Sequence, residues 1–440
     1  MPEPEPGLAE ERAAQLIELE KHFADEARRA LRPQLPGFNV DSPPMELPDY
    51  IDGSLLSEVL LRKPELYNEH RRATTRGGVS FAQCIKPGID LTPQVAAQIA
   101  KGAPRRFESE AAAIGLVAGD DECYTVFKAL FEEVGGRIHA GREAEGVPAQ
   151  PTMLEPELVR STADLDQSGR FVVSASVELR RSVSTILLPP GANTGDRREV
   201  ETVVVAALCG SDEVGESGTP GLVAPNSGQY CPLHDSWSYV KKQGGMTLEE
   251  AEDLAVLGQI FTKPTALMDR AAGLAGDWPD ARGVFQSTDK RMHVRINADD
   301  HVHMVASTAS ADIQGTFARL AAAMLELENG LALQGHSWSC HPVMGFLTSC
   351  PSNVGTGGFR VTSRIRVPLL YRWTVSTALC GWRTACRSVG LTVSGGVFLR
   401  FGHRTRKFRA SSGCLCGGCN WRCDTLMAAR TPATRMRLCS

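Results

Sequence analysis

One cysteine stands in a setting that could do chemistry. Cys350 follows an apolar run over residues 343–347 that is typical of a strand, and it precedes Pro351 and the turn-forming glycines Gly355 and Gly357. A thiol held at a strand end, where the chain bends, can lie at the edge of a cleft. A thiolate there could pair with a cation. Taken alone, such a cysteine is more often a buried structural thiol, and that alternative stays open.

A short acidic segment lies between two expected strands. Residues 291–297 and 302–305 alternate apolar and polar side chains in the way that half-buried strands do. Asp299, Asp300 and His301 fall between these two runs. Residues at such a junction can meet a substrate, but the same three would also suit an ordinary turn.

The elements that must position these residues differ between the two halves of the chain. The first half is helical: an amphipathic helix is expected over residues 8–31 and another over 121–131, with Gly135 and Gly136 ending the second. The Pro- and Gly-rich stretch 145–156 is expected to link two domains.

From residue 171 the pattern changes. Residues 171–177 add a further expected strand, Thr247 is a suitable N-cap for a helix, residues 309–333 predict a long helix, and 210–228 predict a loop. A helical part followed by a mixed antiparallel part predicts the α+β class. The expected divisions are an N-terminal extension (1–50), a helical domain (51–145), a linker (146–170), a sheet-containing domain (171–370) and a tail (371–440).

Composition limits the classes of function. The 440 residues are 42% hydrophobic with a net charge of −4, which suits about two domains and gives no reason to expect nucleic-acid or membrane partners. No apolar run approaches the roughly 20 residues that span a bilayer. The acidic start, Met1 to Pro6, lacks the apolar segment of a signal peptide, so a cytoplasmic location with mostly reduced cysteines is expected.

Several blocks of sequence, in the same order, resemble one family. Residues 114–131 (IGLVAGDDECYTVFKALF) form the first block, and the later ones are residues 188–190, 228–233, 245–247, 277–283, 297–301 and 348–357. Together they resemble the phosphagen kinases, the ATP:guanido phosphotransferases that include creatine kinase and arginine kinase, over roughly residues 55–370. The resemblance implies a small all-helical domain followed by a larger antiparallel sheet flanked by helices, of the glutamine-synthetase-like type.

The resemblance also implies an activity. Members of the family transfer the γ-phosphate of Mg-ATP to a guanidino compound such as creatine or arginine, and magnesium is held through the phosphates rather than by a protein metal site. Arginines stabilise the dense negative charge of the phosphates, and carboxylates bind the guanidinium in a fork. ATP or ADP and a small guanidine are therefore the expected partners, with the protein a monomer or a homodimer.

Four residues of this sequence match functional positions of the family. By resemblance, Cys350 is the reactive cysteine and Asp299 stands where a substrate-orienting glutamate is found, one methylene shorter. Arg181 and Arg360 match arginines that bind the phosphates of ATP, although either could be an ordinary surface charge.

Other family positions carry a different residue here. They are Ser176, Glu178, Gln286, Ala298, His303 and Arg364. Ser176, Glu178 and His303 stand where phosphate-binding arginines are expected, and loss of one such contact costs about 3 kcal/mol, or about a hundredfold in rate. The alternative interpretation is therefore a catalytically degenerate homologue that still binds nucleotide or a partner.

The last seventy residues have a different composition. Seven of the thirteen cysteines lie after residue 370, whereas the last glutamate is Glu328. The resemblance is expected to stop near Leu370, and a shift of reading frame there is our hypothesis, which resequencing of the transcript would test. Two alternatives are a zinc site in residues 414–423, whose cysteines are crowded, and a basic nucleic-acid patch over 404–409.

Overall fold

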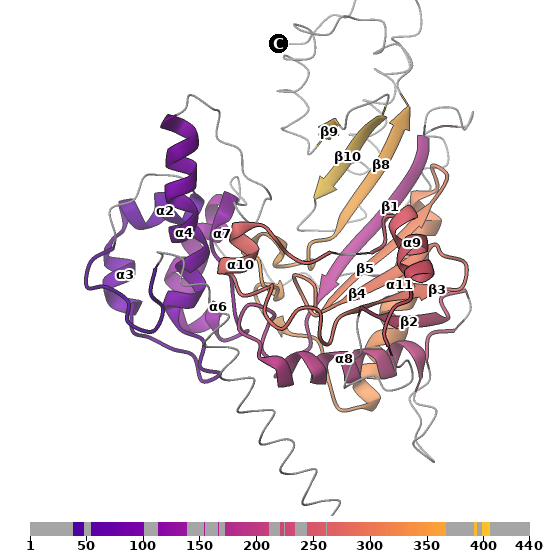
Figure 1. The fold of residues 1–440 in the computed structure, drawn as a ribbon, viewed down its shortest axis with the longest axis horizontal. Coiled ribbons are helices and arrows are strands. Elements are labelled where there is room, and N and C mark those ends of the chain that lie inside the picture. The colour runs from indigo at the N-terminus through magenta and orange to yellow at the C-terminus, as the bar shows by residue number, and fades with distance from the viewer. Residues whose placement is uncertain are drawn as a thin grey trace, which may run out of the picture.

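The computed structural model shows a helical region beside a sheet-containing region (Figure 1). It describes residues 38–47, 54–100, 113–138, 154, 166, 172–210, 221–223, 225–233, 244–260, 262–366, 391–393 and 398–404. The helix expected over 8–31, most of the linker at 145–156 and the middle of the loop at 210–228 lie outside these residues. Within the described part of the chain, no helix combines the length and the apolar character needed to cross a membrane.

Short helices build the first region. They are α2 (Leu55–Arg62), α3 (Glu65–His70), α4 (Phe81–Ala100), α6 (Cys123–Val126) and α7 (Lys128–Ile138). Ser54 caps α2, because its hydroxyl accepts the backbone N–H of Ser57 while the Ser57 hydroxyl accepts the N–H of Ser54. In the core the rings of Phe81 and Phe127 meet edge to face, 5.3 Å apart, which ties α4 to the turn between α6 and α7.

The prediction that Gly135 and Gly136 end a helix was wrong. Helix α7 runs through both glycines to Ile138, and the earlier break falls at Phe127, between α6 and α7. Residues on either side of the glycines explain this. Val134 is fully buried, and Glu133 pairs with Arg137 at 2.9 Å. This packing and the pair offset the roughly 1 kcal/mol that each glycine costs a helix.

One antiparallel sheet forms the second region, which confirms the α+β class. Its strands are β1 (Val172–Arg181), β2 (Gly228–Pro232), β3 (Gly283–Ser287), β4 (Met292–Ile296), β5 (Val302–Thr308), β8 (Arg360–Arg366), β9 (Leu391–Val393) and β10 (Phe398–Arg404). Their order across the sheet is β2-β3-β4-β5-β1-β8-β10-β9. The strands expected from alternation at 171–177, 291–297 and 302–305 are β1, β4 and β5. A small ribbon of β6 (Cys340–His341) and β7 (Gly345–Phe346) lies apart from this sheet.

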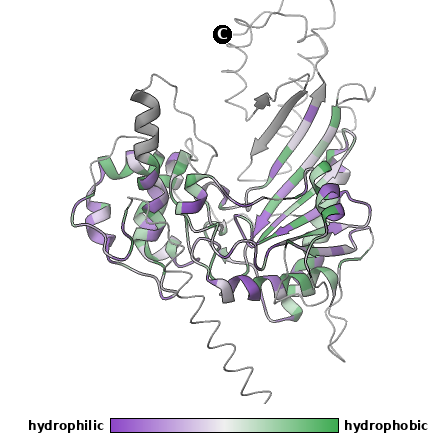
Figure 2. Cartoon of the chain, viewed as in Figure 1, coloured by the Kyte–Doolittle hydropathy of each residue, from purple (hydrophilic) through white to green (hydrophobic). Residues whose placement is uncertain are grey.

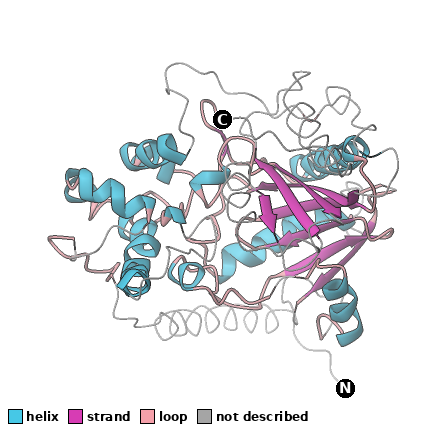
Figure 3. Ribbon diagram, turned by 90° about the horizontal axis from the view of Figure 1, so that it is seen from above, coloured by secondary structure: helices cyan, strands magenta, loops and turns pink. Residues whose placement is uncertain are grey.

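Helices α8 (Thr194–Cys209) and α11 (Ile313–Leu333) cover one face of the sheet. Val177, Val294 and Met304 point to this face and are buried with Phe317 of α11. The alternation of apolar and polar residues along the strands is visible in Figure 2, and Figure 3 shows the strands fanning out beside the helical region. The helix predicted over 309–333 is α11, which begins at Ile313 after its cap Asp312.

Two further helices lie in the second region. The prediction that Thr247 begins a helix is confirmed: α9 (Leu248–Val256) starts there, with a reciprocal capping box between Thr247 and Glu250. Helix α10 (Leu267–Ala271) packs against α4 of the helical region. The chain between α9 and α10 therefore passes from one region to the other.

Candidate active site

A cleft of about 500 Å³ lies where the two regions meet. Arg180, Arg295, His303 and Arg360 line it from the uncovered face of the sheet, because they alternate with the residues that point to α8 and α11. Val117 lines it from the helical region. The rest of the wall comes from segments 262–269 and 349–353, from the turn at 297–299 and from Pro190, Leu274, Trp278 and Arg282.

The structure places Cys350 in the cleft wall. The residue is 8% exposed, and its Sγ lies 3.0 Å from Oγ of Ser352, in the short 3₁₀ turn Pro351–Asn353. The backbone N–H of Ala118 donates to the carbonyl oxygen of Ser349 at 2.8 Å, which attaches this loop to the helical region. The thiol therefore sits at the junction of the two regions, next to a hydroxyl.

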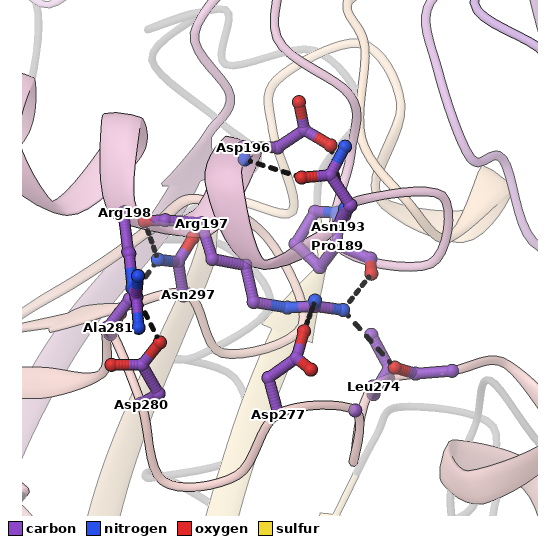
Figure 4. Close-up of polar contacts among 12 residues, drawn as sticks. Pro189, Asn193, Asp196, Arg197, Arg198, Leu274, Asp277, Asp280, Ala281 and Asn297 are labelled. Atoms are coloured by element: carbon purple, nitrogen blue, oxygen red, sulfur yellow. Dashed lines mark hydrogen bonds and ion pairs between the residues drawn. The ribbon is translucent and has the colours of Figure 1, made fainter. Parts of the chain in front are cut away.

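The turn at 297–301 is fixed from beneath. Asn297 has a φ of 54°, a conformation that asparagine tolerates better than most residues. Its side-chain amide donates to the carbonyl oxygens of Arg197 and Ala281, both at 2.8 Å (Figure 4). Arg282 donates from Nε to the Asn297 carbonyl at 3.1 Å. These bonds hold the turn in place and so position the residues that follow it.

Asn297 is anchored on a larger polar network at the start of α8 (Figure 4). Arg197 is buried, with Nη1 2.6 Å from Asp277, and Nη2 donates to the Pro189 carbonyl at 3.2 Å. Its neighbour Arg198 pairs with Asp280 at 2.9 Å. The segment 277–283 thus has a packing role in the described structure.

Asp300 and His301 face away from the cleft and tie the turn to its neighbours. Asp300 Oδ1 accepts the backbone N–H of Ser349 at 2.7 Å, next to Cys350. Nδ1 of His301 accepts the N–H of Val183 at 3.0 Å, so Nε2 carries the proton and donates to the Leu187 carbonyl at 2.9 Å. Burial lowers the pKa of His301 to about 4, in agreement with this neutral form.

Asp299 faces the cleft and is paired with an arginine of the sheet. Its Oδ2 lies 3.0 Å from Nε of Arg180. Burial alone would raise the pKa of Asp299, but the charges of Arg180 and His303 and the hydrogen bonds to the carboxylate together outweigh it and hold the pKa well below its usual range. For Asp300, burial and the adjacent Asp299 charge raise the pKa to about 7. Two neighbouring carboxylic acids thus differ in charge near neutral pH.

Glu178 lies among the cations of the cleft. Its carboxylate is 3.3 Å from Nη1 of Arg360, 3.7 Å from Nη1 of Arg180 and 3.2 Å from Nε2 of His303. Burial opposes its ionisation, but the hydrogen bond from His303 and the two arginine charges outweigh burial and lower the pKa of Glu178 to about 2. Burial, followed by the charge of Arg180, lowers the pKa of His303, although the hydrogen bond to Glu178 opposes this shift.

Arg181 lies on the other side of β1. It is 1% exposed, its Nη1 donates to the carbonyls of Arg180 and Thr356, and its guanidinium stacks 3.5 Å from the ring centroid of Phe346. It does not line the cleft, whereas Arg180 does. The expectation that Arg181 contacts phosphate came from the family resemblance. The two-residue period of a strand could have shown that Arg180 shares the face of Glu178.

The remaining predicted positions divide into two groups. Ala298, His303 and Arg360 line the cleft, whereas Ser176, Gln286 and Arg364 are not in its wall. Sequence reasoning missed Lys263 and Arg295, which do line it. Arg295 donates hydrogen bonds to the backbone carbonyls of Gly258, Gln259 and Ile260. These residues are distant in the sequence, so no local pattern predicts the contacts.

The donor set of the cleft suits an anion. Arg295, Arg360 and Lys263 present cationic N–H groups to it, which are the groups that bind phosphates. Within the described ranges, no group of three or more His, Cys, Asp or Glu residues is arranged to hold a metal ion.

The sequence models of ATP:guanido phosphotransferase match this chain twice, the N-terminal domain at residues 51–134 and the C-terminal catalytic domain at 228–397. The chain belongs to this family. The second match extends beyond Leu370, where the resemblance had been expected to stop.

Individual relatives agree with this assignment. The chain is 32% identical over 293 residues to lombricine kinase of Eisenia fetida, covering 67% of each protein. It is 30% identical over 339 residues to the flagellar creatine kinase of Strongylocentrotus purpuratus, covering 77% of this chain but only 25% of that longer protein.

Solved structures share the fold. A crystal structure of lombricine kinase has a TM-score of 0.67 at 23% identity and covers 86% of this chain and 93% of its own. The substrate-free duplicated taurocyamine kinase of Schistosoma mansoni has a TM-score of 0.62 at 22% identity, covering 82% of this chain and 44% of its own.

Proposed function

We propose that this chain transfers the γ-phosphoryl group of Mg-ATP to a nitrogen of a guanidino compound bound in the cleft. The observation that carries the proposal is that Asp299 and Cys350, an anion and a thiol, line the same cleft as the cations Arg295, Arg360 and Lys263. Phosphoryl transfer requires positive charge around the phosphates and an oriented acceptor, and both kinds of group meet here.

Each residue has a role that follows from its chemistry. Arg295, Arg360 and Lys263 bind phosphate oxygens and stabilise the charge that spreads over them in the transition state. Asp299 accepts N–H groups of the guanidinium and directs its nitrogen toward the phosphorus. Cys350, as a thiolate, adds a second negative group against the same cation. Magnesium bound to ATP neutralises part of the phosphate charge.

The charge pairs of the cleft should slow this reaction. Glu178 pairs with Arg360, and Arg180 pairs with Asp299, so groups needed by both substrates already have partners in the protein. Turnover well below that of a cleft with free arginines is therefore expected. The guanidine used is left to experiment, because the resemblance covers kinases with several acceptors.

The test is ADP release from Mg-ATP by the purified protein, with creatine, arginine, taurocyamine and glycocyamine offered separately against a blank without guanidine. Release with one guanidine supports the proposal and identifies the acceptor. The variant Asp299→Asn serves as control and should lose this release. No release above the blank with any of the four would overturn the proposal and favour a degenerate homologue that retains binding alone.

A further inference from the structure

The guanidinium of Arg180 is paired with Asp299, the carboxylate to which the proposed function assigns the acceptor guanidinium. Its Nε lies 3.0 Å from Oδ2 of Asp299; the Arg180 side chain is only 10% exposed, whereas that of Asp299 is 44% exposed and accessible from the cleft. Arg180 lines the cleft, and its chemical group is the same as that of the expected acceptor. The protein thus carries in its own chain a competitor for the carboxylate that would orient its substrate.

Glu178 stabilises Arg180 in this position from behind. Nη1 of Arg180 is buried and has no hydrogen-bond partner, but it faces the Glu178 carboxylate at 3.7 Å. The backbone N–H of Arg180 donates to the Gly357 carbonyl at 2.7 Å, which fixes its main chain in the sheet. The backbone of Arg180 is therefore fixed, and any movement is confined to its side chain. The guanidinium can leave its present position only if another anion takes over the pairing that Asp299 and Glu178 now provide.

We propose that Arg180 is a specificity-determining residue that makes acceptor binding depend on nucleotide binding. Without nucleotide, its guanidinium occupies Asp299 and excludes a guanidine. The phosphates of a nucleotide in the same cleft attract Arg180 and free Asp299 for the acceptor. The inference rests on the proposed function, since it takes Asp299 as the acceptor carboxylate.

If this proposal is correct, removal of the Arg180 side chain should change the affinities of the two ligands in opposite directions. A guanidine loses its competitor and binds more tightly, whereas a nucleotide loses a cation and binds more weakly. The coupling between the two ligands also disappears, because it is carried by the same side chain. A merely structural Arg180 would not separate the ligands in this way.

The experiment is a ligand-observed NMR titration of methylguanidine, with and without saturating Mg-ADP, into the wild type, Arg180→Ala and the matched control Arg291→Ala, whose side chain lies outside the cleft. In wild type, Mg-ADP should tighten methylguanidine binding about tenfold or more. Arg180→Ala should bind methylguanidine that tightly without Mg-ADP and show no further gain, while its Mg-ADP affinity falls. Arg291→Ala should behave as wild type.

Equal methylguanidine affinity of wild type and Arg180→Ala in the absence of Mg-ADP, including no binding by either, would overturn the inference. If Arg180→Ala is unstable, Arg180→Met keeps the apolar stem, and the same two outcomes decide. The proposed function is judged separately by ADP release from the wild type. Turnover with unchanged methylguanidine affinity in the variant would leave the function standing and remove the inference alone.

Discussion

The two faces of the eight-stranded sheet are built from the same strands but are held in different ways. On the face covered by α8 and α11, Val177, Val294 and Met304 are buried against apolar side chains. On the other face, Glu178 and Arg180 are stabilised by charge pairs beside a cleft. Apolar packing depends on volume, whereas the charged face depends on which partner is present. Substitutions should therefore affect stability on the first face and ligand binding on the second.

The largest expected effect is on the covered face. Phe317→Ala should destabilise the protein by about 3–5 kcal/mol, because Phe317 is buried and packs edge to face on Phe359 at 5.7 Å. Denaturant unfolding followed by circular dichroism measures the loss. Leu325→Ala on the same helix is the control, since Leu325 is 47% exposed, and it should change stability far less. Similar losses for both would contradict this division.

The pH dependence of stability tests the role of Asp300, which lies in the turn between β4 and β5. Its pKa is raised to about 7 in the folded protein, mainly by burial, whereas it is near 4 when unfolded. The folded state therefore holds the proton more strongly, and stability should fall as pH rises from about 4 to 7, by up to about 4 kcal/mol. Asp300→Asn should flatten this part of the stability curve in chemical unfolding at several pH values. An unchanged slope would show that Asp300 does not carry it.

Glu178→Gln should sharpen the contrast on the charged face. Removal of its charge frees Arg360 from a competing anion at 3.3 Å, so Mg-ADP should bind about tenfold more tightly, at a cost in stability because Glu178 also pairs with the buried Arg180. Isothermal titration calorimetry measures the affinity. Glu249→Gln removes an exposed carboxylate of α9 as the matched control. An equal gain in the control would point to net charge rather than to this pair.

The smallest effect concerns an element that supports the charged face from a distance. Thr247→Ala removes the N-cap of α9 and should lower the free energy of unfolding by about 1 kcal/mol. The segment that follows α9 carries the backbone carbonyls that accept hydrogen bonds from Arg295. Thermal unfolding detects the change. Thr125→Ala, at an exposed position on α6, should leave the midpoint nearly unaltered. If both variants melt alike, the cap contributes nothing measurable.

Local patterns predicted the elements better than the site. Alternation of apolar residues located β4 and β5, and Thr247 with its following acids located α9, because both signals depend on neighbours in the sequence. The two glycines of α7 led to a wrong prediction of the helix end. A rule based on glycine alone does not include the burial of Val134 or the Glu133–Arg137 ion pair, which stabilise the helix across them.

In the site, the sequence did not show the direction in which side chains point. Matching residues one by one selected Arg181, whose guanidinium binds backbone carbonyls on the covered side, and passed over Arg180. The pairing of Arg180 with Asp299 joins residues 119 positions apart, which only the folded chain brings together. Cys350 and Asp299 were predicted from the family resemblance of short motifs, and both line the cleft.

The pairing of β10 along β8 has a consequence for the sheet as an assembly surface. In the described strands, Phe398 to Arg404 pair with Arg366 to Arg360. A chain that ended before Phe398 would leave β8 as an outer strand, with its amide and carbonyl groups offered to any other extended peptide. Such strands template edge-to-edge association between molecules. Strand β10 therefore shields β8 from such association along the stretch that starts at Arg360.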